Sequence, residues 1–202
     1  MLIGIVGTKQ AGKQELAQYL VERHNFREIQ IANPDYVTDE ASTILHFASI
    51  SATLDHLMVS SRWTKHYVIQ LNGHLETLEE LKKRPFFLLV SIQAPITLRF
   101  NRYRKASLSS ESIVSFEEFA RLDDKSLFFK KPNLDVIMHH ADLKVVNTFK
   151  DFDKFYTYLD GLDIVNEERC RPSWDTYFIK LCDWSARRSN CMILPPCFQL
   201  IG

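Results

Sequence analysis

Short apolar runs alternate with helical patterns along most of this chain, and this alternation is what most constrains its fold. The clearest run covers residues 86–92, which are almost all apolar and too few for an isolated helix. Strands that alternate with helices pair in parallel and are covered on both faces. The chain is therefore predicted to form a three-layer α/β fold with helices on both sides of a parallel sheet. Its other expected strands are residues 2–6, 28–32, 67–71 and 142–146.

Helix-capping residues and helical periodicity fill the segments between these strands. Thr38 or Asp39 is expected to begin a long helix that includes Leu45. His139 and His140, by contrast, have strand-like surroundings that favour opposite faces of a sheet. The remaining helices are expected at residues 14–23 and 75–83, after Pro95, after a capping box that begins at Ser115, and after Thr148.

A glycine-rich loop follows the first strand. The residues Gly7-Thr-Lys-Gln-Ala-Gly12-Lys13-Gln14 match the phosphate-binding loop pattern at both glycines and at the lysine. Such a loop turns its backbone N–H groups around phosphate oxygens, and the helix that follows favours an anion at its amino end. We therefore predict that Gly7, Thr8, Gly12 and Lys13 bind a nucleotide.

The position after the lysine departs from the phosphate-loop pattern. A Ser or Thr there contributes a hydroxyl that helps to hold Mg²⁺, and this chain has Gln14 instead. The substitution argues against efficient phosphoryl transfer. We expect any nucleotide to bind with little or no dependence on Mg²⁺.

The order of the elements resembles that of small P-loop kinases of the nucleoside-monophosphate and dephospho-coenzyme A kinase type. In such folds the third strand often ends in an acid that orients magnesium, whereas this chain has Asn72. The helix after Pro95 follows as a kinase lid does, and it would place Arg99 and Arg102 on one face to bind anionic phosphates. The alternative is a solvated basic face without a ligand.

The last expected helix begins at Pro172 and Ser173 and carries an apolar stripe that includes Trp174, Tyr177, Phe178 and Leu181. Its sequence Arg171-Pro-Ser-Trp-Asp-Thr-Tyr-Phe, followed by Ala186-Arg-Arg-Ser-Asn-Cys-Met, resembles the start of the deaminase domain of fungal deoxycytidylate deaminases. The opening Met1-Leu-Ile-Gly-Ile-Val-Gly-Thr-Lys and the segment Arg84-Pro-Phe-Phe are also similar to that family. The resemblance covers residues 1 to about 192 and ends after Met192.

This resemblance implies two domains. Residues 1–162 would form a P-loop NTPase- or kinase-like domain, and residues 163–202 would form a linker and the truncated start of a cytidine-deaminase-like domain. The helix at residues 172–186 either packs on the first domain as its last helix or belongs to the second. In the second case its exposed apolar stripe favours a homo-oligomer.

The family reaction converts dCMP and water to dUMP and ammonia, which supplies thymidylate synthesis. The resemblance implies that this chemistry needs zinc held by His-x-Glu and Pro-Cys-x-x-Cys motifs. The sequence contains neither motif, and Pro196-Cys197 has no second cysteine after it. We therefore predict no catalytic residue and no metal ligand, and we do not expect this chain alone to deaminate dCMP.

Charge and cysteine usage narrow the class of protein. The 25 basic and 25 acidic residues give a formal net charge of zero, which argues against nucleic acid or an anionic membrane as partner. Four irregularly spaced cysteines are typical of free thiols in a reducing compartment. The short apolar amino terminus lacks the positive charge of a signal peptide, and no run approaches the length of a membrane span. We expect a soluble protein of the cytoplasm, and of the nucleus as a further location.

Three functions stay open at this point. The chain can belong to a deoxycytidylate deaminase, act as a small P-loop kinase or NTPase, or form a non-catalytic domain for nucleotide sensing or assembly. We take the first as its ancestry and the third as the behaviour of this chain.

Overall fold

The computed structural model describes residues 1–31, 42–59, 62, 64–71, 75–106, 114–129 and 133–188. The chain divides into two compact units, Met1–Val165 and Asn166–Gly202. The predicted helix start at Thr38 or Asp39, the neutral Asn72 and the Pro196-Cys197 pair lie outside the described residues. Each unit is described by itself.

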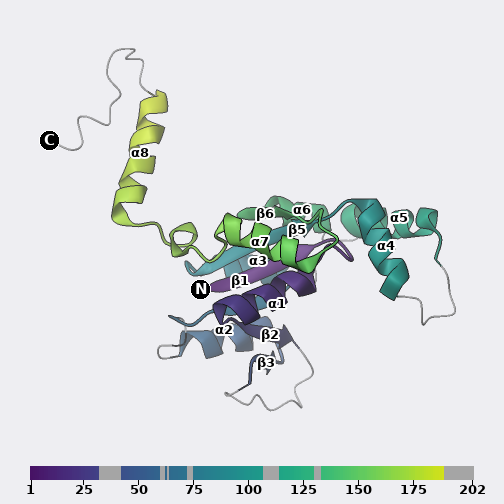
Figure 1. The fold of residues 1–202 in the computed structure, drawn as a ribbon. Coiled ribbons are helices and arrows are strands. Elements are labelled where there is room, and N and C mark those ends of the chain that lie inside the picture. The colour runs from purple at the N-terminus through teal and green to yellow at the C-terminus, as the bar shows by residue number, and fades with distance from the viewer. Residues whose placement is uncertain are drawn as a thin grey trace. The chain divides into compact units, whose positions relative to one another are not determined.

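Strands and helices alternate along the first unit (Figure 1). The strands are β1 (Leu2–Gly7), β2 (Arg27–Ile31), β3 (Ile44–Phe47), β4 (Tyr67–Gln70), β5 (Phe87–Gln93) and β6 (Leu143–Val146). The helices are α1 (Lys13–His24), α2 (Ile50–Met58), α3 (Leu75–Lys82), α4 (Ile96–Ala106), α5 (Phe116–Asp124), the π-helical η2 (Lys125–Phe129), α6 (Leu134–His139) and α7 (Phe152–Leu162).

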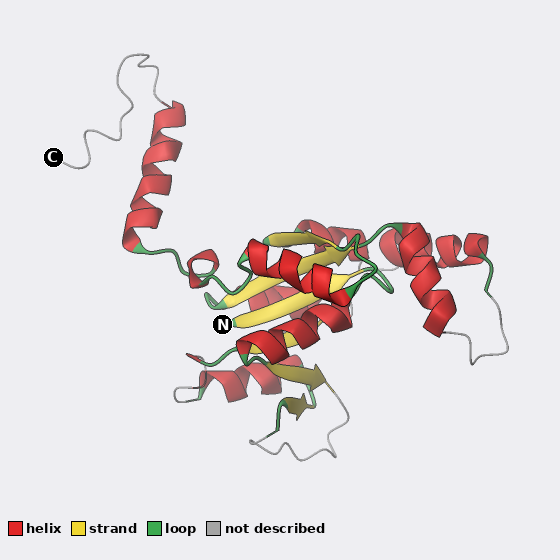
Figure 2. Ribbon diagram, viewed as in Figure 1, coloured by secondary structure: helices red, strands yellow, loops and turns green. Residues whose placement is uncertain are grey.

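The six strands form one parallel sheet in the order β3-β2-β4-β1-β5-β6 (Figure 2). Strand β1 lies inside the sheet, and its Leu2 pairs with Tyr67 of β4 on one side and with Phe87 of β5 on the other. All six residues of β1 are buried, as expected of a parallel strand covered on both faces. The predicted α/β class is thus confirmed.

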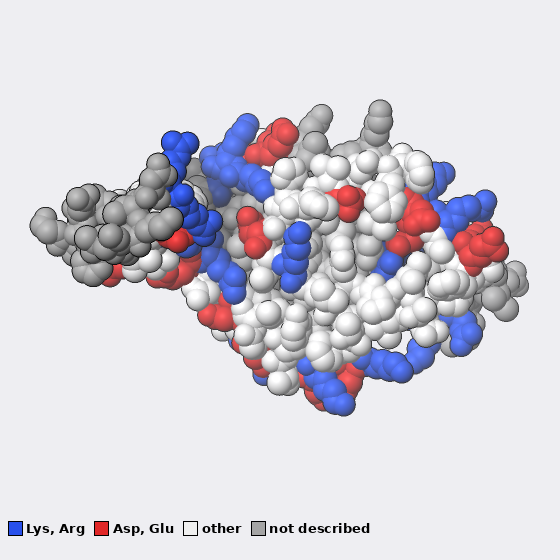
Figure 3. Space-filling model, turned by 90° about the horizontal axis from the view of Figure 1, so that it is seen from above, with Lys and Arg blue, Asp and Glu red and all other residues white. Residues whose placement is uncertain are grey.

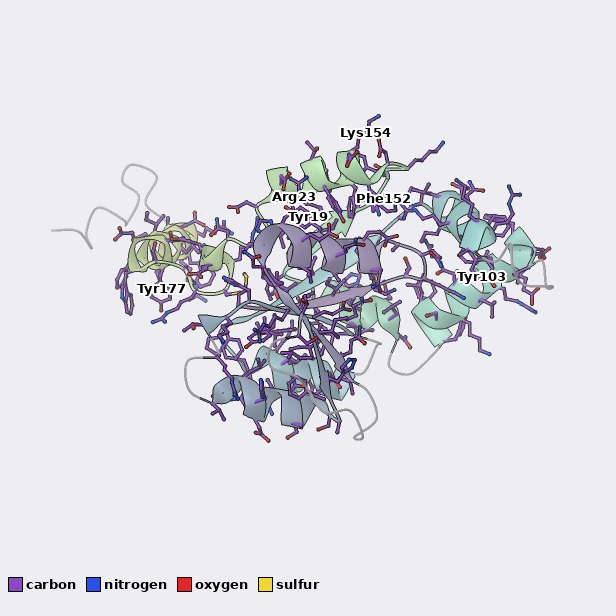
Figure 4. All side chains as sticks on the ribbon, turned by 60° about the horizontal axis from the view of Figure 1, so that its bottom comes forward. Tyr19, Arg23, Tyr103, Phe152, Lys154 and Tyr177 are labelled. Atoms are coloured by element: carbon purple, nitrogen blue, oxygen red, sulfur yellow. The ribbon has the colours of Figure 1, made fainter. Side chains whose placement is uncertain are left out.

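Helices cover both faces of the sheet. One face carries α2, α3 and α6, whose Leu57, Leu81 and Ile137 join a single apolar cluster with the strand side chains. The other face carries α1 and α7, which Figure 4 shows side by side above the sheet. The Tyr19 hydroxyl of α1 donates a hydrogen bond of 2.7 Å to Asp160 of α7, which ties these two helices together. Helices α4 and α5 lie beyond the carboxyl ends of the strands, where ligands bind in open α/β sheets (Figure 1).

The structure corrects three expectations for local structure. Leu45 belongs to β3, an edge strand paired with β2, and the following helix begins only at Ile50 after its cap Ser49. The four residues of β3 fit a helical pattern as well as a strand pattern, so pairing with β2 decides their conformation. His139 ends α6, so the histidine pair is not in a strand.

Helix α7 begins later than its sequence suggests. Its cap is Asp151, whose carboxylate accepts from the Asp153 N–H at 3.4 Å, and Thr148 lies outside the helix. Thr and Asp are both common N-cap residues, so the sequence alone does not indicate whether Thr148 or Asp151 begins the helix. The capping box at Ser115 is confirmed at its first half, because the Ser115 hydroxyl accepts from the Glu118 N–H at 3.1 Å.

The second unit contains a short 3₁₀ turn, Glu167–Arg169, and the helix α8 (Trp174–Arg188). The Ser173 hydroxyl accepts from the Thr176 N–H, which agrees with the predicted helix start. The Trp174 and Phe178 rings stack at 5.8 Å, and Trp174 is 75% exposed. The predicted apolar stripe therefore exists and offers an aromatic surface.

Charges of both signs are mixed over the face that Figure 3 displays, and no basic tract crosses it. In the part of the chain that the structure describes, no helix combines the length and the apolar character needed to cross a membrane.

The Gly7→Ala substitution is predicted to destabilise the first unit by about 2–4 kcal/mol. A Cβ at Gly7 would lie 2.2 Å from the Ile92 carbonyl oxygen, and backbone on both sides resists movement. The matched control is Gly161→Ala in α7, where a Cβ meets nothing within 4 Å and the helix gains about 0.5–1 kcal/mol. Urea unfolding checks both, and a Gly7→Ala protein as stable as wild type would contradict this account.

Candidate functional site

The loop between β1 and α1 has the backbone of a ligand cradle. Gly12 has φ of 110°, a conformation that side chains rarely adopt, and Gln10 has φ of 61°. The Ala11 N–H closes a turn onto the Thr8 carbonyl at 3.3 Å. Helix α1 starts at Lys13, and its N-cap residue Gly12 has no side chain that could accept hydrogen bonds from the first N–H groups of the helix. A helix start of this kind favours an anion.

Lys13 lies against this loop. Its ammonium donates to the carbonyl oxygens of Gly7 and Thr8 at 3.0 Å each. Burial lowers the pKa of Lys13, because desolvation disfavours the charged ammonium, and nearby Glu15 partly offsets this. An anion at the loop would restore the charge balance around the lysine.

The hydroxyl of Thr8 has no hydrogen-bond partner among the described residues, although Thr8 is only 4% exposed. A buried hydroxyl without a partner costs about 1–3 kcal/mol. A ligand oxygen in the loop would remove that cost. Thr8 therefore points to the same kind of ligand as Lys13.

Arg102 of α4 forms hydrogen bonds with the backbone of the loop. Its Nη1 donates to the carbonyl oxygens of Gln10 and Ala11 at 3.1 and 3.2 Å, and its Nη2 donates to Asn147 Oδ1 and the Phe149 carbonyl at 3.2 and 2.7 Å. Burial lowers the pKa of Arg102, but four acceptors surround the guanidinium. The structure thus brings Arg102 to the predicted loop, where it clamps the backbone.

Asn147, at the end of β6, completes the clamp. Its Nδ2 donates to the Ala11 carbonyl at 3.0 Å. A Cβ on Gly12 would approach that Nδ2 to 2.4 Å, so the loop needs glycine here for space as well as for its φ angle.

Arg99 has a different environment. Its two Nη atoms donate to the two carboxylate oxygens of Asp123 at 2.6 and 2.7 Å, and its Nε donates to the Ala94 carbonyl. Arg99 is only 5% exposed, so a solvated basic face is the wrong description of this residue. The pair joins α4 to α5. A role of Arg99 in nucleotide binding stays a prediction.

A cavity of about 420 Å³ adjoins the loop on the side of Gln14. The Gln70 amide, at the end of β4, donates to Gln14 Oε1 and to Glu28 Oε1 at 3.2 Å each. Gln14 therefore offers no hydroxyl to a metal, and its amide oxygen is already engaged. Glu28, Gln30 and Gln70 escaped the sequence analysis. The position of Gln70 near the carboxyl end of a predicted strand was a usable signal, whereas Glu28 lies at the amino end of its strand and gave none.

A smaller cavity of about 230 Å³ lies between the loop and helices α4 and α5. Lys9, Tyr103, Phe119 and Asp123 contribute to its lining. The Lys9 ammonium lies 4.6 Å from the centre of the Tyr103 ring, which is labelled in Figure 4, so a cation–π contact links the loop to α4.

The residues that the structure describes do not form a zinc site of the deaminase type. Among the described residues, no three His, Cys, Asp or Glu side chains are grouped as metal ligands would be. The two described cysteines, Cys170 and Cys182, form no disulfide bond among the described residues. The sequence itself lacks both zinc motifs. No step through zinc follows from this chain.

These features together define an α/β protein with a parallel sheet and, after its first strand, a glycine-rich loop that matches the phosphate-loop pattern. Over nearly its whole length the chain is similar to proteins named deoxycytidylate deaminase. It is 33% identical over 195 residues to the one from Schizosaccharomyces pombe, which covers 94% of this chain and 59% of the relative. It is 32% identical over 206 residues to the one from Saccharomyces cerevisiae, which covers 95% of this chain and 58% of the relative. The chain thus spans less than two thirds of the length of these curated relatives.

One of the similar solved structures supports the fold. An uncharacterized protein from Eubacterium ventriosum superposes with a TM-score of 0.51 at 13% identity, over 80% of this chain and 97% of that one. A shikimate kinase from Acinetobacter baumannii in complex with shikimate gives a TM-score of 0.44 at 16% identity, over 82% and 93%. No family profile matches the chain.

The Asp123→Asn substitution is predicted to cost about 3–5 kcal/mol of unfolding free energy, because it leaves the Arg99 cation buried without a countercharge. Arg23→Gln is the control, since it removes a half-exposed ion pair with Asp160 at 3.5 Å and should change stability by less than about 1 kcal/mol. Urea unfolding measures both. Equal effects of the two substitutions would show that Arg99 does not depend on Asp123.

Proposed function

We propose that the first unit is a phosphate-binding domain of a protein in the deoxycytidylate deaminase family, and that it binds a nucleotide without transferring its phosphate. One observation carries the proposal: Lys13 and the start of α1 lie together on the concave loop after β1. The buried Thr8 hydroxyl adds a further group that a phosphate oxygen would satisfy.

The absence of phosphoryl transfer is inferred from the groups beside Lys13. Transfer in phosphate-loop enzymes needs a hydroxyl at the next position to help hold Mg²⁺. Gln14 occupies that position, and its amide oxygen accepts a hydrogen bond from Gln70. The role that these residues support is recognition of a nucleotide, as in sensing or assembly.

Membership in the deaminase family is proposed from the similarity over nearly the whole chain. In this view α8 is the first helix of the catalytic domain, and its exposed Trp174 and Phe178 pack on parts of that domain that the longer relatives contain. The relatives' reaction, by their names, acts on deoxycytidylate. We propose that this chain alone does not perform it, because the two zinc motifs are missing from its sequence.

As an alternative use of the same α8 surface, a homo-oligomer is proposed with residues 172–186 as the contact. The support is the aromatic surface of α8, where Trp174, Tyr177 and Phe178 form mutual ring contacts and are exposed within their unit. Exposed apolar patches of this kind mark interaction surfaces.

The wild-type chain is predicted to bind inorganic pyrophosphate, and Lys13→Ala is predicted to weaken this binding at least about tenfold through the loss of a charge-assisted contact. EDTA should leave the affinity unchanged. The matched control is Lys154→Ala, the same change at an exposed lysine of α7 labelled in Figure 4. Isothermal titration calorimetry measures the pyrophosphate affinity of the wild-type chain, with and without EDTA, and of both variants.

Unchanged binding by Lys13→Ala would refute the phosphate-loop assignment. Mg²⁺-dependent consumption of ATP that Lys13→Ala abolishes would instead establish the kinase or NTPase function.

The purified 202-residue chain is predicted to contain zinc far below one ion per chain and to leave dCMP unconverted. The reason is that loss of the metal removes the activated water that attacks the base. Metal analysis and a chromatographic assay for dUMP check the two points. Conversion of dCMP by this chain would show that a site other than the expected motifs holds the reacting water.

A further inference from the structure

The cavity of about 420 Å³ is lined by Gln14, the residue after the loop, and it reaches the carboxyl edge of β2 and β4. Glu28, which also lines it, is the second residue of β2. Its lining includes the last strand residues Ile31 and Gln70, together with Ile50 at the start of α2. Ligands of open α/β sheets bind at this edge, and the volume is in the range of small-molecule pockets. The cavity is therefore placed and sized to hold a small ligand.

The charge of this cavity differs from that of the loop. Glu28 is the one ionisable residue among the described lining residues, and the other polar lining side chains are Gln14, Gln30, Gln70 and Thr77. A phosphate would meet a carboxylate there, whereas at the loop it meets Lys13 and the helix start. The first turn of α1 links the two places, because Lys13 contacts the loop and Gln14 lines the cavity. One ligand with an anionic end and a neutral end would fill both.

Hydrogen-bond chemistry specifies the neutral end. The Glu28 carboxylate only accepts hydrogen bonds, and the bond from Gln70 uses part of its capacity. Glutamine amides both donate and accept. Apolar side chains such as Ile29 and Ile50 complete the lining. A flat ring with apolar faces and an edge that carries an amino donor matches these groups.

We propose that this cavity binds the base of a nucleotide that carries an exocyclic amino group, with its phosphate at the Gly7–Lys13 loop. This inference rests on the phosphate-binding function proposed above. Glu28 accepts from the amino group, as carboxylates accept from the cytosine N4 amino group, and the glutamine amides bond to the neighbouring ring positions. A base with an oxo group at the same position would place an oxygen against the carboxylate and be rejected.

The test compares nucleotides that differ in this one group. Isothermal titration calorimetry of the full chain measures dCMP against dUMP and AMP against IMP, with inorganic pyrophosphate as the probe of the loop alone. We expect the amino member of at least one pair to bind about tenfold or more tightly than its oxo partner. The ring size of the preferred pair identifies the base as a pyrimidine or a purine.

Two substitutions connect this preference to the cavity. Glu28→Gln can accept from an amino group and donate to an oxo group, so the preference should fall to within about threefold while pyrophosphate affinity is unchanged. Glu22→Gln is the matched control, because Glu22 is a partner of Gln18 on the exposed side of α1 and the preference should persist. Gln70→Leu, which removes the donor to Glu28, should also weaken binding of the amino nucleotide without affecting pyrophosphate.

The outcomes separate the two proposals. If pyrophosphate binds and both nucleotide pairs show no preference, or if the preference survives in Glu28→Gln and Gln70→Leu, the cavity assignment is overturned and the phosphate-binding function stands. If neither pyrophosphate nor any nucleotide binds, both proposals fail. Retained pyrophosphate binding shows that each variant is folded.

Discussion

The close approach of the loop backbone to the sheet is the constraint on which the rest of the site depends. Gly7 lies so near the Ile92 carbonyl that no side chain fits between them. Gly12 holds a left-handed conformation against the Asn147 amide. Arg102 then joins the two carbonyl groups of Gln10 and Ala11 to the segment after β6. Segments more than ninety residues apart in sequence fix one loop, so its shape does not depend on a ligand.

The parts of the fold that sequence predicts are those in which local pattern and burial agree. Strands β1 and β5 are continuous apolar runs, since both of their faces are covered by helices. The segment at Leu45 fits helix and strand equally, and only its pairing with β2 makes it β3. The surroundings of His139 resemble a strand, yet they form α6, whose Ile137 and Met138 pack into the core. Tertiary contact decides both cases.

The site shows the same division. The sequence pattern of Gly7, Gly12 and Lys13 indicated a loop between the first strand and helix, and the structure has that loop between β1 and α1. Nucleotide binding by Gly7, Thr8, Gly12 and Lys13 stays a prediction. Arg102 was predicted as a phosphate ligand, but its four acceptors come from the loop and from the β6–α7 connection, which its own helix does not reveal. Asp123, the partner of Arg99, lies on another helix. Partners of this kind depend on how separate elements pack, which one sequence without a structure does not specify.

The chemistry on the two sides of Lys13 separates recognition from catalysis. A phosphate-loop enzyme needs a metal-binding oxygen beside the lysine, so that charge on the transferred phosphoryl group is neutralised. In this chain that place belongs to a network of Gln14, Gln70 and Glu28, whose atoms bond to each other. Such a network fixes the amide and carboxylate positions before any ligand arrives, which favours discrimination between ligands. Lys13 and the start of α1 lie on one side of this network, and on the other side its amide and carboxylate groups line the cavity. Under the proposed function, such an arrangement would let the domain select among ligands, and it would lack the metal-binding oxygen that phosphoryl transfer needs.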